Sequence, residues 1–183
     1  KAWEISEDGK VITLYLRKGM KWSDGQPYTA DDILFWWEDI VLNDELTPSK
    51  PAIMKRKGEL AEVKKVDDYT VQFVFAAPYG IFPTYLASWG GPRTGPNTSP
   101  KHYLSQFHPK YAAGEDIEKM MKEQNFENWT DLFGFMASDN NPDKPSLYAW
   151  VINERPPQAI QTYRRNPYYW KVDTAGNQLP YIG

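Results

Sequence analysis

Apolar and polar side chains alternate in two separate parts of the chain, which is typical of paired β-strands. Over residues 3–17 the alternation runs on either side of an Asp-Gly pair at 8–9. An Asp-Gly pair between alternating segments is a strong signal for a tight hairpin turn. A second alternating segment covers residues 61–78, where Asp67 and Asp68 separate its halves. The pattern therefore predicts two antiparallel hairpins.

A helix is predicted to begin after Thr29. The motif T-x-x-D lets the Thr29 hydroxyl accept a hydrogen bond from a first-turn amide, while the Asp32 carboxylate reaches back to the amide of Thr29. In an α-helix Trp36 is turned by roughly 100° from Trp37, so we expect Trp36 at or beyond the edge of the buried face. That buried face is predicted to carry Ile33, Trp37, Ile40 and Val41, with Leu34 at its flank.

Two further motifs are predicted to shape the chain rather than to contact a ligand. In the run Trp-Ser-Asp-Gly, Asp24 favours a turn and Gly25 is free to adopt a positive φ. Near the other end, Asn166 and Pro167 are expected to stop a strand, and Arg165 is expected to hold a nearby carboxylate or carbonyl oxygen. Thr29 and Asp32 are also predicted to have a structural role, because they cap the helix.

The remaining pattern predicts helices and one more strand pair. Ser99 and Pro100 resemble a helix start. Loops are predicted by composition at 92–100 and 138–146. Helical segments are expected at 101–107, 114–124 and 128–137, and strands on either side of 154–157. The order of strands, helix, strands, helices and strands indicates an α+β fold with mixed sheets and packed helices.

Composition narrows the classes of protein. The chain has 183 residues, of which 41% are apolar, so it can bury a substantial core. A net charge of -3 with interspersed signs offers no basic stripe for nucleic acid. The apolar run at 33–37 is far shorter than the roughly 20 residues of a membrane-spanning helix. The absence of cysteine excludes disulfides. Because neither end resembles a natural terminus, we expect residues 1–183 to be an excerpt.

The sequence contains few residues that could form a catalytic site or a metal-binding site. The chain has two histidines, no cysteine and no G-x-S-x-G motif, so it lacks the usual nucleophile and base. His102 and His108 are six residues apart, which matches no common metal-binding pattern. We expect no metal, no cofactor and no enzyme. Adjacent carboxylates occur where caps and turns favour them, at Asp31-Asp32, Asp67-Asp68 and Glu115-Asp116.

Aromatic residues are the remaining candidates for recognition. The eight Trp, twelve Tyr and eight Phe include side chains with an apolar face and a polar edge, which suit sugar rings or peptide side chains. Most must lie in the core. As candidate ligand-binding residues we name Trp36, Trp89 and Tyr85, and for the two tryptophans a core role remains equally open.

Three stretches together resemble one protein family. They are ITLYLRKGMKWSDGQPYTADDILF at 12–35, VKKVDDYTVQFVFAAP at 63–78 and YRRNPYYW at 163–170. Their order and spacing resemble the extracellular solute-binding proteins, family 5, of ABC importers, which include the oligopeptide-, dipeptide- and nickel-binding proteins. The segments at 99–111, 128–133 and 166–182 resemble members of this family that take peptides or oligosaccharides.

The resemblance implies a two-lobed periplasmic-binding-protein-like fold that closes over a solute and docks on a membrane permease. It implies that residues 1–183 are a partial solute-binding domain, made of the small α+β subdomain and part of the first lobe, with the second lobe absent. We expect a monomer that is extracellular or periplasmic, with an N-terminal lipid anchor in the full-length protein.

Two alternatives remain open. A glycoside-active enzyme would need two suitably spaced carboxylates in an aromatic cleft. A protein-interaction domain would present exposed aromatic side chains in an apolar patch.

Overall fold

The computed structural model describes residues 2–87, 95–157 and 159–181. The chain divides into two units, each built from two stretches of sequence. Unit 1 comprises Lys1–Gly19 and Thr29–Ser99, and unit 2 comprises Met20–Tyr28 and Pro100–Gly183. Helices and strand pairs occur in both units, and the strand pairs of the described residues are antiparallel. The α+β class expected from the sequence is confirmed.

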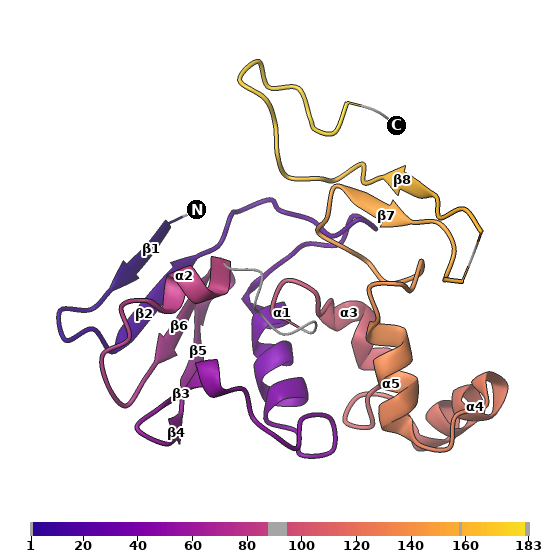
Figure 1. Ribbon diagram of the computed structural model, residues 1–183, viewed down its shortest axis with the longest axis horizontal. Coiled ribbons are helices and arrows are strands. Elements are labelled where there is room, and N and C mark those ends of the chain that lie inside the picture. The colour runs from indigo at the N-terminus through magenta and orange to yellow at the C-terminus, as the bar shows by residue number, and fades with distance from the viewer. Residues whose placement is uncertain (1, 88–94, 158, 182–183) are drawn as a thin grey trace. The chain divides into compact units, whose positions relative to one another are not determined.

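Unit 1 contains a four-stranded antiparallel sheet in the order β1-β2-β6-β5 (Figure 1). Both hairpins predicted from the alternating pattern are present, and β2 pairs with β6 to join them into one sheet. The strands are β1 (Ala2–Ile5), β2 (Val11–Tyr15), β5 (Glu62–Asp67) and β6 (Thr70–Val74).

The strand register lines up the apolar core of this sheet. Phe73 in β6 lies opposite Ile12 in β2 and opposite Val63 in β5. Residues directly opposite each other share a face of the sheet, and these three side chains are buried. A slip of one residue would expose them, so the hydrophobic pattern specifies the pairing.

The first hairpin turns where the Asp-Gly pair predicts it. Gly9 has φ +71, a conformation that favours glycine. A Cβ at Gly9 would lie 3.1 Å from the Cβ of Pro78. The Ser6 hydroxyl donates to Asp8 Oδ1 at 2.6 Å and accepts from the amide of Val11 at 2.9 Å. Side-chain hydrogen bonds therefore hold the turn between β1 and β2.

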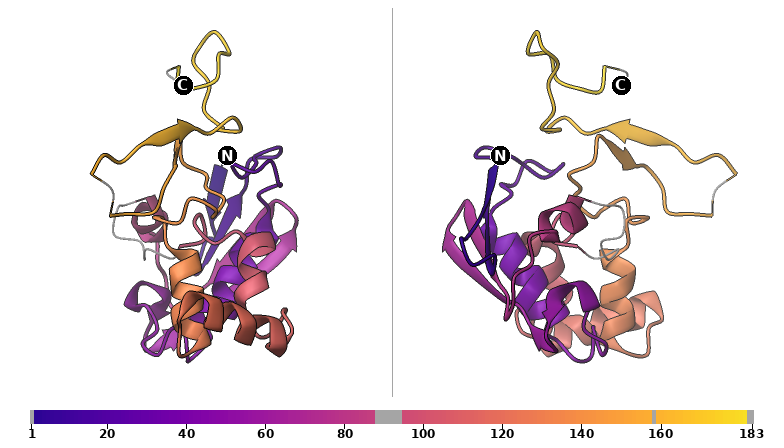
Figure 2. Two further views of the ribbon diagram at one scale, coloured as in Figure 1. Left: turned by 90° about the vertical axis from the view of Figure 1, so that its right-hand side faces the viewer. Right: turned by 60° about the vertical axis from the view of Figure 1, so that its left-hand side comes forward.

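Helix α1 (Ala30–Phe35) begins with the expected capping box. The amide of Thr29 donates to Asp32 Oδ2 at 2.9 Å, and the Thr29 hydroxyl accepts from first-turn amides. The amide of Ala30 donates to the carbonyl of Asp68, which ties the helix start to the turn between β5 and β6. Figures 1 and 2 show α1 beside the sheet of unit 1.

The helix continues as a π-helical turn, η1 (Trp36–Val41), and this changes the expected pattern of burial. The amide of Leu42 donates to the carbonyl of Trp37, five residues earlier, at 2.9 Å. The predicted face is buried as expected. However, Trp36 is also only 2% exposed, so the expectation that it lies at or beyond the edge of the buried face is wrong. A π-turn widens the helix, so the angular step of an α-helix does not apply here.

Several short elements of unit 1 were not predicted, namely η2 (Ala52–Met54), β3 (Lys55–Arg56) and β4 (Glu59–Leu60). A tight turn with positive φ at Lys57 and Gly58 joins two strands of two residues each. Helix α2 (Phe82–Ala87) lies in an apolar stretch with helical spacing. Its Phe82 is fully buried, with its ring centroid 5.0 Å from that of Phe73.

Unit 2 combines helices with a separate β-hairpin, which Figures 1 and 2 show as β7 beside β8. The side chain of Asn128 caps α5 by accepting from the amide of Asp131 at 2.8 Å. Ser99 is not a cap, because Pro100 takes that position and the Ser99 hydroxyl donates to the carbonyl of Gly95. The elements are α3 (Lys101–Leu104), η3 (Ser105–Phe107), α4 (Gly114–Gln124), α5 (Trp129–Ala137), β7 (Trp150–Ile152) and β8 (Tyr163–Arg165).

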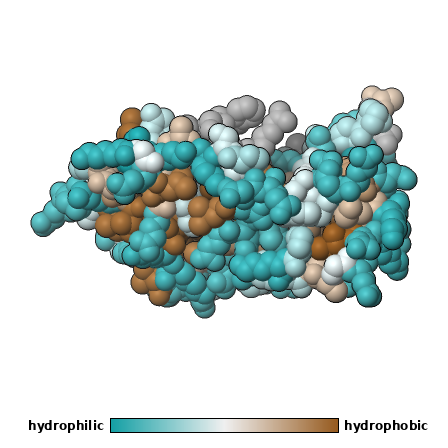
Figure 3. All heavy atoms as spheres, turned by 90° about the horizontal axis from the view of Figure 1, so that it is seen from below, coloured by the Kyte–Doolittle hydropathy of each residue, from teal (hydrophilic) through white to brown (hydrophobic). Residues whose placement is uncertain are grey.

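The surface is mostly hydrophilic on the face seen in Figure 3, with apolar side chains gathered in patches between polar ones. In unit 1 the exposed large apolar residues include Trp3, Val66 and Ile81. Scattered exposed apolar residues are normal on folded proteins. Among the described residues, no helix combines the length and the apolar character that crossing a membrane requires.

The capping box yields a first prediction. Thr29→Ala should lower the free energy of unfolding by about 1 kcal/mol, because the first-turn amides lose their acceptor. Urea unfolding measures this change. Thr29→Ser keeps the hydroxyl and should restore most of the stability. Thr84→Ala removes an exposed threonine of α2 and serves as the control; an equal loss in both alanine variants would contradict the role of the cap.

Candidate functional site

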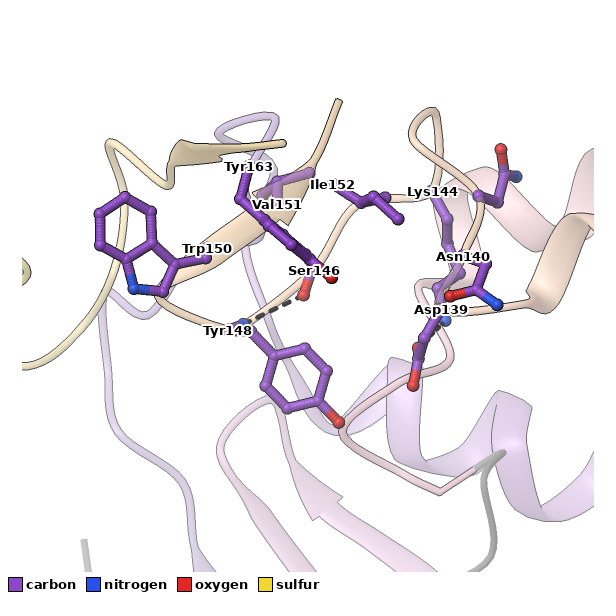
Figure 4. A pocket seen from close by; sticks show the side chains of 10 residues that line it. Asp139, Asn140, Lys144, Ser146, Tyr148, Trp150, Val151, Ile152 and Tyr163 are labelled. Atoms are coloured by element: carbon purple, nitrogen blue, oxygen red, sulfur yellow. Dashed lines mark hydrogen bonds and ion pairs between the residues drawn. The ribbon is translucent and has the colours of Figure 1, made fainter. Parts of the chain in front are cut away.

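A pocket of about 210 Å³ lies within unit 2, between the loop that follows α5 and the β7–β8 hairpin (Figure 4). In the close-up, the aromatic side chains of Tyr148, Trp150 and Tyr163 occupy one part of its lining. Asp139 and Lys144 lie together on the opposite side. The pocket thus combines flat apolar rings with charged and polar groups.

The loop at 138–149 holds its shape through part-buried hydrogen bonds. Asn141 is 2% exposed, and its side-chain amide donates to the Tyr103 hydroxyl at 2.8 Å and to the carbonyl of Met136 at 2.9 Å. Further along, the amide of Ser146 donates to the Ser23 hydroxyl, and the amide of Ser23 donates to the carbonyl of Ser146, both at 3.0 Å. The loop is therefore tied to α5 and to the segment Met20–Tyr28.

The hairpin places the aromatic side chains. Tyr163 in β8 lies opposite Ile152 in β7, and Trp150 lies two residues before Ile152. Residues two apart on a strand, and residues opposite each other, share one face of the hairpin. Trp150 is 37% exposed, and Tyr148 and Tyr163 are each 55% exposed. These rings can contact a bound molecule without unfolding the hairpin.

An ion pair between a buried lysine and an exposed aspartate forms the charged part of the lining. Lys144 Nζ lies 2.5 Å from Asp139 Oδ1 and donates to the carbonyl of Ala137 at 2.9 Å. The lysine is 4% exposed, and burial lowers its pKa from the ordinary value, although Asp139 opposes that shift. Burial also raises the pKa of Tyr148, with a smaller contribution from the charge of Asp139. Lys144 and Asp139 together add no net charge to the pocket.

Acidic groups are sparse in the lining of the pocket. Asp139 is its single lining carboxylate, and it is already paired with Lys144. Glycoside hydrolysis ordinarily uses two carboxylates flanking the scissile bond. Over residues 2–87, 95–157 and 159–181, no group of three or more His, Cys, Asp or Glu could hold a metal ion.

The three residues named from the sequence as ligand candidates do not line this pocket. Trp36 lies in the buried part of unit 1, with its ring centroid 5.9 Å from that of Trp37, and this burial favours the core role that the sequence left open. Tyr85 in α2 is 42% exposed and its ring lies 6.0 Å from Tyr79. Trp89 lies outside the described residues, so it stays a prediction.

Asp24 and Gly25 form the expected turn in unit 2. Gly25 has φ +89, and a Cβ there would lie 3.1 Å from the ring of Tyr168. Asp24 Oδ1 accepts from the amide of Gln26 at 3.1 Å, and Asp24 Oδ2 lies 2.7 Å from His102 Nε2. These contacts fix the turn and link it to α3.

Arg165, Asn166 and Pro167 follow the end of β8. Arg165 Nη2 donates to the backbone carbonyl of Gln178 at 3.2 Å and to its side-chain carbonyl at 3.1 Å. Asn166 is fully buried, and its side-chain amide donates to the carbonyls of Tyr148 at 2.9 Å and Ser146 at 3.3 Å. Asn166 therefore supports the loop that lines the pocket.

His108 is buried, at 5% exposure. Its Nδ1 accepts from the amide of Lys110 at 3.2 Å, and its ring packs against Trp129 and Phe133. His108 has a packing role in unit 2.

The sequence did not identify the pocket residues. Its loop was recognised by composition alone, and composition assigns no chemistry to Asp139 or Lys144. The spacing of Tyr148 and Trp150, followed by Tyr163 beyond the turn, was the available signal, because it places aromatic residues close together on a predicted hairpin.

Comparison with protein families matches residues 1–183 to the model described as bacterial extracellular solute-binding proteins, family 5 Middle. The chain is 41% identical over 182 residues to the periplasmic alpha-galactoside-binding protein of Rhizobium meliloti (strain 1021), covering 100% of this chain and 24% of that protein. It is 28% identical over 197 residues to the periplasmic oligopeptide-binding protein OppA of Escherichia coli (strain K12), covering 99% of this chain and 30% of that protein.

Solved structures give the same result. A structure of an oligopeptide-binding protein OppA has a TM-score of 0.87 and 48% identity, covering 98% of this chain and 27% of that one. The periplasmic binding protein MelB of agrobacterium fabrum C58, in complex with stachyose, has a TM-score of 0.74 and 39% identity, covering 99% and 24%. The chain thus spans between 24% and 30% of the length of these relatives.

Trp36 yields a prediction about its role. Because it is buried, Trp36→Ala should lower the free energy of unfolding by about 3–5 kcal/mol through loss of apolar contacts and formation of a cavity. Urea unfolding measures the loss. Trp3→Ala, at a residue that is 55% exposed in the same unit, is the control and should cost far less. A small loss at Trp36 would argue for a ligand-facing role.

The ion pair yields a pH prediction. Asp139→Asn should lower the pKa of Lys144 further, because the carboxylate is what opposes the effect of burial. The pKa of Lys144 is lower in the folded protein than in the unfolded chain. At pH values between these two pKa values, the unfolded chain therefore binds more protons than the folded protein. The contribution of this group to stability therefore rises as pH increases through that window.

Carbon-13 NMR titration of the Lys144 ε-methylene measures this pKa directly. Asp143→Asn neutralises a carboxylate in the same loop that is not among the causes of the Lys144 pKa shift, and it is the control. An equal change in both variants would show that Asp139 has no specific effect on Lys144.

Proposed function

Because this chain belongs to the bacterial extracellular solute-binding proteins, family 5, we propose that the protein carrying it is the substrate-binding component of an ABC importer. The observation that carries this proposal is the family match across all of residues 1–183. The protein captures a small solute in a cleft between two lobes and delivers it to a membrane permease. Residues 1–183 contribute the small α+β subdomain and part of the first lobe.

The solute is an oligosaccharide or an oligopeptide. Support for the first comes from similarity to an alpha-galactoside-binding protein and to a structure with stachyose, and support for the second comes from similarity to OppA proteins. The named ligands of those proteins define the two classes to test.

Capture depends on differential affinity for a closed state. A ligand shifts an equilibrium between open and closed forms only as far as it binds one form more tightly. Transport requires no chemical change in the solute. The protein is therefore a receptor and not an enzyme, which agrees with the single, paired carboxylate of the pocket in unit 2.

The protein acts as a monomer outside the cytoplasmic membrane. Periplasmic relatives support this location. Attachment through an N-terminal lipid is part of the same proposal, because a receptor held near its permease meets it at a higher effective concentration.

A binding experiment tests the proposal. The complete gene product should melt at a higher temperature with neutral oligosaccharides or with oligopeptides, since a ligand at 100 times its Kd stabilises a protein by about 2.7 kcal/mol. Residues 1–183 alone should bind the same ligand much more weakly, because a cleft that lacks one lobe makes fewer contacts. Differential scanning fluorimetry and calorimetric titration measure both effects.

Three outcomes would count against the proposal. If neither oligosaccharides nor oligopeptides raise the melting temperature, the result would contradict the importer function. Micromolar binding by residues 1–183 alone would contradict the division of the site between two lobes. If chromatography shows that the protein hydrolyses a bound oligosaccharide, the result would instead support an enzyme.

A further inference from the structure

We propose that the pocket in unit 2 is a subsite for one neutral sugar ring of an oligosaccharide ligand. This inference rests on the proposed function, because it selects one of the two solute classes and assigns residues to it. The residues are Tyr148, Trp150 and Tyr163 on the aromatic side, and Asp139 and Asn140 on the polar side.

The size of the pocket fits one ring rather than a whole oligosaccharide. Its volume of about 210 Å³ is smaller than the roughly 300–1,000 Å³ of pockets that enclose complete drug-sized ligands. The pocket therefore suits a subsite that holds one unit of a longer ligand, whose other units bind elsewhere.

The aromatic side chains suit the apolar face of a sugar. A pyranose ring presents C–H groups with slight positive charge on one face, and an aromatic ring presents a negative π face. Trp150, Tyr148 and Tyr163 keep between 37% and 55% of their surface open. Exposed tryptophan and tyrosine rings lose little conformational entropy on binding, because each side chain has only two rotatable bonds.

The polar side suits hydroxyl groups and disfavours charged groups. Asp139 retains 47% side-chain exposure while its Oδ1 pairs with Lys144, so its carboxylate can still accept hydrogen bonds from hydroxyl groups. The exposed amide of Asn140 can both donate and accept. A peptide terminus would need an opposite charge, yet the charged lining residues Asp139 and Lys144 already neutralise each other.

The lining is already in place in the structure. Lys144 is held by Asp139 and by the carbonyl of Ala137, and the buried side chains of Asn141 and Asn166 hold the surrounding loop by hydrogen bonds. Such an arrangement reduces the entropy lost when a ligand binds. The sugar ring would meet a formed surface rather than a loop that has to fold around it.

The test compares two tryptophans with equal exposure. Trp150 lines the pocket, whereas Trp170 is also 37% exposed in unit 2 but does not line it. In the complete gene product, Trp150→Ala should weaken binding of stachyose by about tenfold or more, since truncating an aromatic anchor commonly has an effect of this size. Trp150→Phe keeps a flat ring and should retain most of the affinity, and Trp170→Ala should change it by less than about twofold. Calorimetric titration measures all four proteins.

The outcomes separate this inference from the proposed function. Loss of stachyose affinity in Trp150→Ala but not in Trp170→Ala supports the subsite. Unchanged affinity in both variants, with stachyose still bound, overturns the subsite and leaves the importer function standing. Binding of oligopeptides that depends on Trp150 overturns the assignment to sugar. Failure of the unmodified protein to bind either class overturns the proposed function as well.

A second measurement covers the case in which Trp150→Ala fails to fold. In nitrogen-15 NMR spectra of the unmodified protein, the indole N–H signal of Trp150 should move during titration with stachyose, and that of Trp170 should remain in place. Movement of the Trp170 signal alone would overturn the inference.

Discussion

The shape of the pocket in unit 2 depends on the buried side chain of Asn166. Its amide donates to the carbonyls of Tyr148 and Ser146, its Oδ1 accepts from the amide of Tyr168 at 2.9 Å, and its own backbone amide donates to the carbonyl of Ala149 at 2.9 Å. A buried polar group without partners is costly, whereas a fully bonded one fixes a single arrangement. This side chain therefore joins the end of β8 to the loop before β7.

The sequence predicted the parts of the fold that depend on neighbouring residues. The turn at Gly9 and the capping box at Thr29 and Asp32 each require only a few residues in a row. Alternation identified the strands of unit 1 because one side of that sheet is buried. Local chemistry and hydrophobic periodicity were sufficient for these elements.

The sequence could not predict features that depend on longer-range packing. Trp36 is buried at the point where the helix changes to a π-turn, and no residue near it signals that change as a proline or glycine would. Lys144 belongs to a polar, proline-containing loop, and such a composition is typical of segments exposed to solvent. In the structure, however, Lys144 is almost fully buried beside Asp139. The pocket therefore could not be predicted from the sequence, because it depends on how the loop and the hairpin pack against each other.

The segment Met20–Tyr28 has a consequence for how the chain is made. It belongs to unit 2 although the residues on both sides of it belong to unit 1. Ser23 bonds to Ser146, which is 123 positions later, and Asp24 contacts His102. On the ribosome, this segment must wait for partners that are translated much later, so the second unit cannot mature before Ser146 has been made. Contacts this distant in sequence slow folding because loop closure precedes any gain.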